Sequence, residues 1–195
     1  RTLRIICGWR YKSDIPSESK FSRVFKELSD LQIAAKTHEQ FVKEYLSNTV
    51  FMYNAIDATK IPLRVKPVKV EKEENPKNKV GRPKKSEVKE PKQPTILQQQ
   101  QTMTTTKEML SLVSTHCGVG IKQNSKGNRE VWIGGKLHIS AVDGDIPVAA
   151  FYSGANVHDS SVALPLINET SKRVNYLYDL QDAGYDSNII RDFSK

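Results

Sequence analysis

Residues 50–61, VFMYNAIDATKI, are the stretch from which the fold of this chain can be argued. Aromatic and β-branched side chains dominate it and charges are few, which is the pattern of a strand buried on both faces of a sheet. The exception is Asp57, a lone carboxylate near the C-terminal end of the expected strand. Because a buried acid needs a partner, the rest of the sequence has to supply one.

The chain changes character directly after this strand. Residues 62–92 contain eleven Lys or Arg against five Glu, so +6 of the net charge of +8 lies here. Five prolines and no aromatic residue leave little from which to build a core, and the Gln- and Thr-rich residues 98–106 extend this composition. We therefore expect residues 62–128 to form a basic, largely flexible insertion.

The N-terminal quarter carries helical patterns. Residues 17–28 place four apolar side chains at the i, i+3, i+4, i+7 spacing of one helix face, namely Phe21, Val24, Phe25 and Leu28. A second helix is expected at residues 37–47. Residues 1–49 are thus predicted to be a small helical region that serves DNA binding or dimerisation.

Ordered structure is expected to resume at residue 129 with two antiparallel strands. Apolar and polar residues alternate along residues 137–142, and Asp143 and Gly144 form the turn signal of a hairpin. A helix follows within residues 158–172, where Asp159 or Ser160 is the expected cap. Pro165 is tolerated there only in the first turn.

A last strand and a last helix complete the pattern. Residues 173–186 are interpreted as a strand that ends in acids, and Ser187 as the cap of a final helix. The resulting order, βββαβα, is the ribonuclease H-like arrangement of a mixed sheet in an α/β domain, built from residues 50–61 and 129–195. In it the first and fourth strands become parallel neighbours.

Parallel neighbours would bring Asp57 and Asp182 together beyond the carboxyl ends of their strands. Two adjacent carboxylates repel unless a divalent cation lies between them, and Mg²⁺ prefers carboxylates, water and phosphate oxygens as ligands. The pair therefore predicts metal-dependent phosphoryl transfer. The alternative is that Asp57 is a strand-end acid whose carboxylate bonds to Thr59 or to the backbone.

Four segments carry a resemblance to a known family, namely residues 14–28, 54–61, 124–167 and 173–186. Together they resemble the DDE transposases of bacterial insertion sequences, of the insertion-sequence-four type. The most specific blocks are GGKLHISAVDGDIP at 134–147, ANVHDS at 155–160 and DLQDAGYD at 179–186. The resemblance spans nearly the whole chain.

This resemblance implies that Asp57 and Asp182 are the first and second catalytic aspartates, both ligands of Mg²⁺ or Mn²⁺. Asp186 is the alternative second acid. The third acid of the family is a glutamate on a later helix, and no residue before Lys195 takes that role. We accordingly expect the chain, which begins with Arg1, to be a fragment that is inactive by itself.

The implied substrate is double-stranded DNA, both the ends of the insertion sequence and the target, bound by a homodimer in the bacterial cytoplasm at the nucleoid. Residues 79–87, KVGRPKKSE, resemble an AT-hook, in which Arg82 would enter a narrow minor groove. Lys84 and Lys85 would contact phosphates.

Two alternative functions remain open from the sequence: a noncatalytic DNA-binding remnant that acts through the basic insertion, and a ribonuclease H-like nuclease. A membrane partner is not expected, because no run of about 18 apolar residues occurs.

Overall fold

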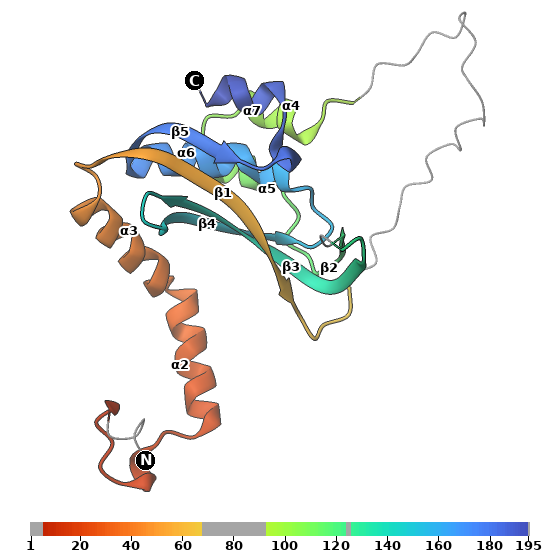
Figure 1. Ribbon diagram of the computed structural model, residues 1–195. Helices are drawn as coiled ribbons and strands as arrows, with labels where there is room; N and C mark the ends of the chain where they lie inside the picture. The colour runs from red at the N-terminus through yellow and green to blue at the C-terminus, as the bar shows by residue number, and fades with distance from the viewer. Residues whose placement is uncertain (1–5, 68–92, 124–125, 195) are drawn as a thin grey trace, which may run out of the picture. The chain divides into compact units, whose positions relative to one another are not determined.

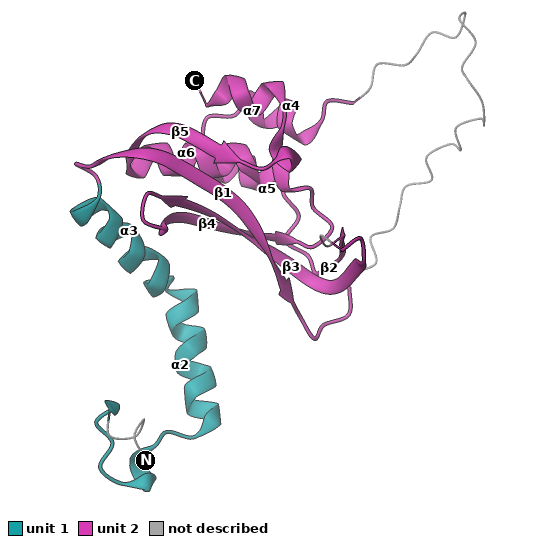
Figure 2. Ribbon diagram, viewed as in Figure 1, with its two compact units in different colours: residues 1–46 teal, residues 47–195 magenta. Residues whose placement is uncertain are grey.

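The computed structural model describes residues 6–67, 93–123 and 126–194. The chain divides into two compact units, residues 1–46 and 47–195 (Figure 2). The first unit contains η1 (Lys12–Asp14), α2 (Glu18–Asp30) and α3 (Ile33–Tyr45). The side chain of Ser17 caps α2 by accepting a hydrogen bond from the Lys20 N–H, which confirms the first predicted helix. The second begins four residues earlier than predicted.

The second unit is an α/β domain with a mixed sheet of five strands (Figure 1). Its elements are β1 (Val50–Pro62), α4 (Ile96–Gln101), α5 (Thr106–Ser111), β2 (Gly118–Gln123), β3 (Arg129–Val142), β4 (Ile146–Gly154), η2 (Asp159–Val162), α6 (Ala163–Arg173), β5 (Asn175–Gln181), η3 (Ala183–Tyr185) and α7 (Asn188–Phe193). The sheet order is β2-β3-β1-β5, and β4 also pairs with β3.

Strand β3 pairs with three other strands of the sheet. Its residues 134–142 pair antiparallel with β1, while β2 and β4 share its other edge, β2 along residues 129–134 and β4 along residues 135–142. Gly134 lies where these partners change, with φ at +152°. A Cβ there would lie 2.0 Å from the carbonyl oxygen of Ile61, so only glycine fits this close approach. The β3–β4 hairpin confirms the predicted antiparallel pair.

Strand β1 is sandwiched between β3 and β5 and pairs with β5 in parallel, from Val50 opposite Asn175 to Ile56 opposite Gln181. This confirms that the first and last predicted strands become parallel neighbours, since α6 provides the crossover between β4 and β5. Burial on both faces holds for only part of β1. Phe51 and Ile56, which lie on opposite faces, are 7% and 3% exposed, whereas Met52 is 57% exposed. The main core lies against the face that carries Ile56.

The hydrophobic core lies between that face of the sheet and the helices (Figure 1). Helix α6 supplies the largest share, and its Leu164 and Leu166 are fully buried. Burial of each such side chain contributes about 1.5–3 kcal/mol. Pro165 lies in the first turn of α6, as predicted, so its missing N–H breaks no helical hydrogen bond.

A polar network inside the sheet fixes β1 against its neighbours. The Ser140 hydroxyl donates to Asn54 Oδ1 at 2.5 Å and lies 2.6 Å from the Thr170 hydroxyl on α6. The Asn54 amide donates to Asp179 Oδ1 on β5 at 2.7 Å, and burial raises the pKa of Asp179. Because buried polar groups need partners, this network holds the register that places Asp57 three residues further on.

The predicted flexible insertion contains ordered elements, so its boundary at residue 128 is wrong. Helices α4 and α5 and strand β2 all lie within residues 62–128. Gln100 is fully buried and its amide donates to the carbonyl oxygens of Met109 and Ser161. The Gln-rich composition misled the prediction because a glutamine whose amide donors have acceptors can enter a core. Residues 68–92 lie outside the described part of the chain.

Candidate active site

Asp57 and Asp182 follow neighbouring residues of two parallel strands. Asp57 comes directly after Ile56 on β1, Asp182 directly after Gln181 on β5, and Ile56 pairs with Gln181. The carboxyl ends of parallel strands form one edge, where open α/β sheets bind ligands. Both side chains line one cavity of about 370 Å³, here called the carboxylate cavity. The structure thus brings the two predicted acids to one place.

Each carboxylate is oriented by one backbone amide. Asp57 Oδ1 accepts a hydrogen bond from the Ala58 N–H at 2.7 Å, which is the backbone contact that the alternative interpretation of this residue expects. Asp182 Oδ1 accepts from the Gly184 N–H at 2.9 Å and so caps η3. A carboxylate has two oxygens and about four lone-pair directions. Both acids therefore retain acceptor capacity for a ligand.

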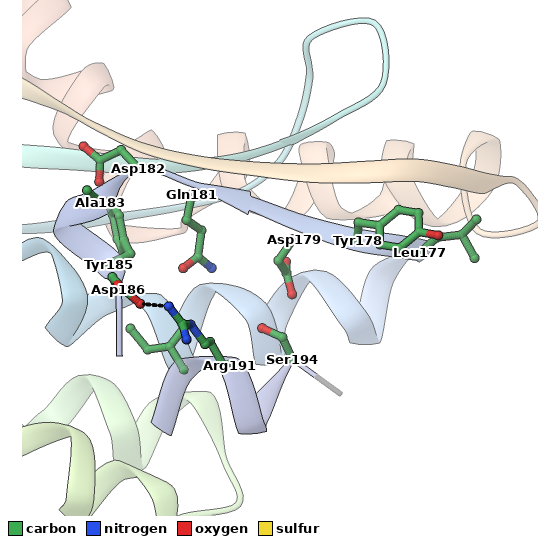
Figure 3. Close-up of a pocket in the computed structure, with 11 residues that line it drawn as sticks. Leu177, Tyr178, Asp179, Gln181, Asp182, Ala183, Tyr185, Asp186, Arg191 and Ser194 are labelled. Carbon is green, nitrogen blue, oxygen red and sulfur yellow. Dashed lines mark hydrogen bonds and ion pairs between the residues drawn. The ribbon is translucent and has the colours of Figure 1, made fainter. Parts of the chain in front are cut away.

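Asp186, the alternative second acid, lies elsewhere. Its carboxylate pairs with Arg191 on α7, and both residues line a second cavity of about 520 Å³ between β5 and α7. In Figure 3 a dashed line joins Asp186 to Arg191 beside the helix, while Asp182 lies above them at the end of the strand. Asp182 lines both cavities, but the carboxylate cavity does not include Asp186. The geometry favours Asp182 as the partner of Asp57.

An ion pair that the sequence did not predict lies in the wall of the carboxylate cavity. The Lys136 ammonium on β3 donates to Asp159 Oδ1 and to the Val157 carbonyl oxygen, both at 2.8 Å. The Lys136 side chain is only 16% exposed. Asp159 or Ser160 was expected to cap the helix, but the His158 side chain is the cap and accepts a hydrogen bond from the Ser160 N–H. The sequence did contain one indication that Lys136 is buried: it lies two residues before His138, on the same face of the strand, and His138 is buried.

The β2–β3 hairpin forms the remaining wall, which the predicted insertion boundary excluded from the site. Lys122 and Glu130 face each other in the register of this hairpin, and both line the cavity together with Trp132. Glu130 forms an ion pair with Lys60 of β1. The cavity therefore combines carboxylates with lysines that come from β1, β2 and β3.

Two buried aromatic groups lie under the electrostatic influence of the carboxylates. Burial lowers the pKa of His138 to about 4, against an opposing effect of Asp159 and Asp57. Burial also raises the pKa of Tyr185, and the charges of Asp159, Asp57 and Asp182 raise it further. Both side chains are consequently neutral near pH 7, so the charge of the cavity comes from its carboxylates and lysines.

The residue set fits a magnesium ion better than a metal that needs a full protein cage. Among the described residues, no three His, Cys, Asp or Glu side chains gather as a metal-binding group. Mg²⁺ commonly takes one or two carboxylates and keeps water or substrate phosphate oxygens as its other ligands. The pair of Asp57 and Asp182 suffices for that mode of binding.

The predicted DNA-binding residues Arg82, Lys84 and Lys85 lie outside the described residues. In the described ranges, no helix combines the length and apolar character that crossing a membrane requires.

Comparisons with protein-family models, curated proteins and solved structures gave no match to this chain. The function of this chain is therefore inferred from the site and from the sequence resemblance.

Proposed function

We propose that this protein is a DNA transposase of the DDE type in which Asp57 and Asp182 bind a divalent metal ion, Mg²⁺ or Mn²⁺. One observation carries the proposal. Ile56 of β1 pairs with Gln181 of the parallel strand β5, and the two residues that follow them, Asp57 and Asp182, line one cavity. The sequence resemblance adds the reaction class, cleavage and strand transfer of insertion-sequence ends.

The topology supports a ribonuclease H-like fold as part of this proposal. Along the β4-β3-β1-β5 path the first three strands are antiparallel, α6 crosses over, and β5 joins β1 in parallel. This is the strand order that the βββαβα pattern requires. It puts Asp57 on β1 and the end of β5 at the point where the strand order reverses, which is where such sheets bind ligands.

The two carboxylates would hold the metal ion, and the backbone amides of Ala58 and Gly184 would keep each carboxylate in orientation. The chemistry that such an ion supplies when bound is charge stabilisation at a phosphoryl oxygen and activation of an attacking oxygen. The contribution of the chain itself is positioning, because a small misplacement of reacting groups costs orders of magnitude in rate.

Binding of Mn²⁺, followed by electron paramagnetic resonance, tests this proposal without requiring activity. Asp57→Asn and Asp182→Asn should each weaken Mn²⁺ binding by about tenfold or more, because loss of a direct ligand should cost at least what loss of a supporting partner costs. Asp186→Asn is the matched control, since Asp186 lies outside the carboxylate cavity. Equal Mn²⁺ affinity in wild type and Asp57→Asn would refute the metal site.

The reaction itself separates this proposal from its alternatives. A transposase yields DNA in which the cut end is joined to a target, whereas a ribonuclease H-like nuclease yields only cut DNA. A noncatalytic DNA-binding remnant yields neither product and retains DNA binding when Asp57 is replaced by Asn.

A further inference from the structure

The lysines of the carboxylate cavity differ in how they are held. Lys60 is an exposed partner of Glu130, and exposed ion pairs leave little net charge or stabilisation. Lys122 is an exposed residue of β2. Lys136 alone among these three is largely buried and fixed by two hydrogen bonds of 2.8 Å. It is therefore the preorganised cation of the cavity.

Lys136 retains one donor for a ligand. An ammonium group carries three N–H donors, and the Val157 carbonyl and the Asp159 carboxylate accept two of them. The residue lines the same cavity as Asp57 and Asp182. The third N–H is thus available to an acceptor that enters the cavity.

Stability alone does not account for this ion pair. A partly buried pair is often no more stabilising than apolar side chains of the same volume, because both charges lose hydration. The arrangement has the features of a fixed anion-binding group beside two carboxylates.

We propose that Lys136, with Lys122 on the neighbouring strand β2, forms a phosphodiester-binding subsite in the carboxylate cavity. This inference rests on the proposed function: a nucleic-acid strand would place one backbone phosphate at Lys136 next to the phosphate that meets Asp57 and Asp182. Asp159 and the Val157 carbonyl act as positioning groups that hold the ammonium in place. Phosphate oxygens are the acceptors that lysine binds as a point charge.

Trp132 offers a local reporter for the test. It lines the cavity and is one of two tryptophans in the chain. In full-length protein carrying Trp9→Phe, titration with a DNA duplex of arbitrary sequence should change Trp132 fluorescence. Lys136→Gln in the same background should weaken binding by about tenfold and lower the slope of log affinity against log salt by about 0.9.

Three variants separate a phosphate contact from loss of charge or loss of structure. Lys172→Gln is the control, because Lys172 is an exposed lysine that donates to the Thr106 hydroxyl outside this cavity, and it should leave the slope unchanged. Lys136→Arg should restore most of the affinity. If Lys136→Gln does not fold, the double variant Lys136→Gln/Asp159→Asn removes both charges and should show the same loss of slope.

The inference is overturned if DNA leaves Trp132 fluorescence unchanged, or if the salt slope of folded Lys136→Gln or of the double variant equals that of the parent protein. Failure of the proposed function looks different. In that case Asp57→Asn would not weaken Mn²⁺ binding, while the dependence of DNA binding on Lys136 would persist.

Discussion

At the residue scale, His138 shows how tightly the sheet is built behind the carboxylates. The imidazole is fully buried on β3, its Nε2 lies 2.8 Å from the Ser153 hydroxyl, and Nδ1 has no hydrogen-bond partner among the described residues. Burial is the main cause that lowers its pKa to about 4. Protonation would place a charge in the core next to the Lys136 ammonium.

This shift predicts a pH dependence of stability. The unfolded chain protonates His138 near pH 6.5, whereas the folded chain does so near pH 4, so between these values the unfolded state binds more protons and stability falls as the pH falls. The full effect is about 3 kcal/mol. Urea unfolding of wild type and His138→Gln across this range should show a flatter profile for the variant. Parallel profiles would contradict the neutral histidine.

At the scale of elements, the β3–β4 turn is tied to the beginning of β1. The Asp143 carboxylate accepts hydrogen bonds from the N–H groups of Met52 at 2.6 Å and Tyr53 at 3.1 Å. Register pairing between β1 and β3 begins one residue later, at Asn54 opposite Val142. A side chain thus satisfies the two backbone donors that the ladder leaves out.

Replacement of Asp143 should therefore cost more than replacement of its neighbour in the turn. Asp143→Ala is expected to lower the free energy of unfolding by about 1–3 kcal/mol, because two amides lose a charged acceptor. Asp145→Asn is the control: Asp145 has φ at +59°, which asparagine also tolerates. Urea denaturation of both variants gives the measurement, and equal losses would show that the turn conformation alone matters.

At the scale of the whole molecule, most of the net positive charge lies in one segment of the sequence. Residues 62–92 hold most of the net charge, but the chain remains tied to the sheet beyond β1. The Leu63 N–H donates to the Ile133 carbonyl oxygen at 2.8 Å, and the Cys117 thiol contacts the Val65 carbonyl oxygen. A deletion that spares the domain must begin after these contacts.

Replacement of residues 68–92 by an uncharged Gly/Ser linker of equal length should weaken DNA binding and flatten its salt dependence, because phosphate contacts release counterions in proportion to their number. Mn²⁺ binding at the carboxylate cavity should not change. Fluorescence anisotropy with labelled duplex DNA measures the first effect. Unchanged affinity would assign DNA binding to the described domains instead, and a linker that keeps only KVGRPKKSE tests the AT-hook-like segment.

The element order could be predicted because local signals set it. Periodicity located α2, the aromatic and β-branched composition located β1, and the Asp-Gly pair located the β3–β4 turn, since side-chain spacing, composition and turn geometry are properties of short segments. The parallel pairing of β1 with β5 could then be inferred from that order and from the handedness of the crossover connection. Asp57 and Asp182 could thus be placed at one edge without coordinates.

Only the tertiary structure decided which other groups share that edge. Lys136 and Asp159 meet because a bend after β4 brings η2 beside β3, and the β2–β3 hairpin closes the cavity from a segment whose composition suggested no fold. Such contacts join residues that are distant in sequence, and their energies depend on burial and satisfied hydrogen bonds rather than on residue type. The sequence by itself determined the order of the strands and the two acids, and packing determined the cavity around them.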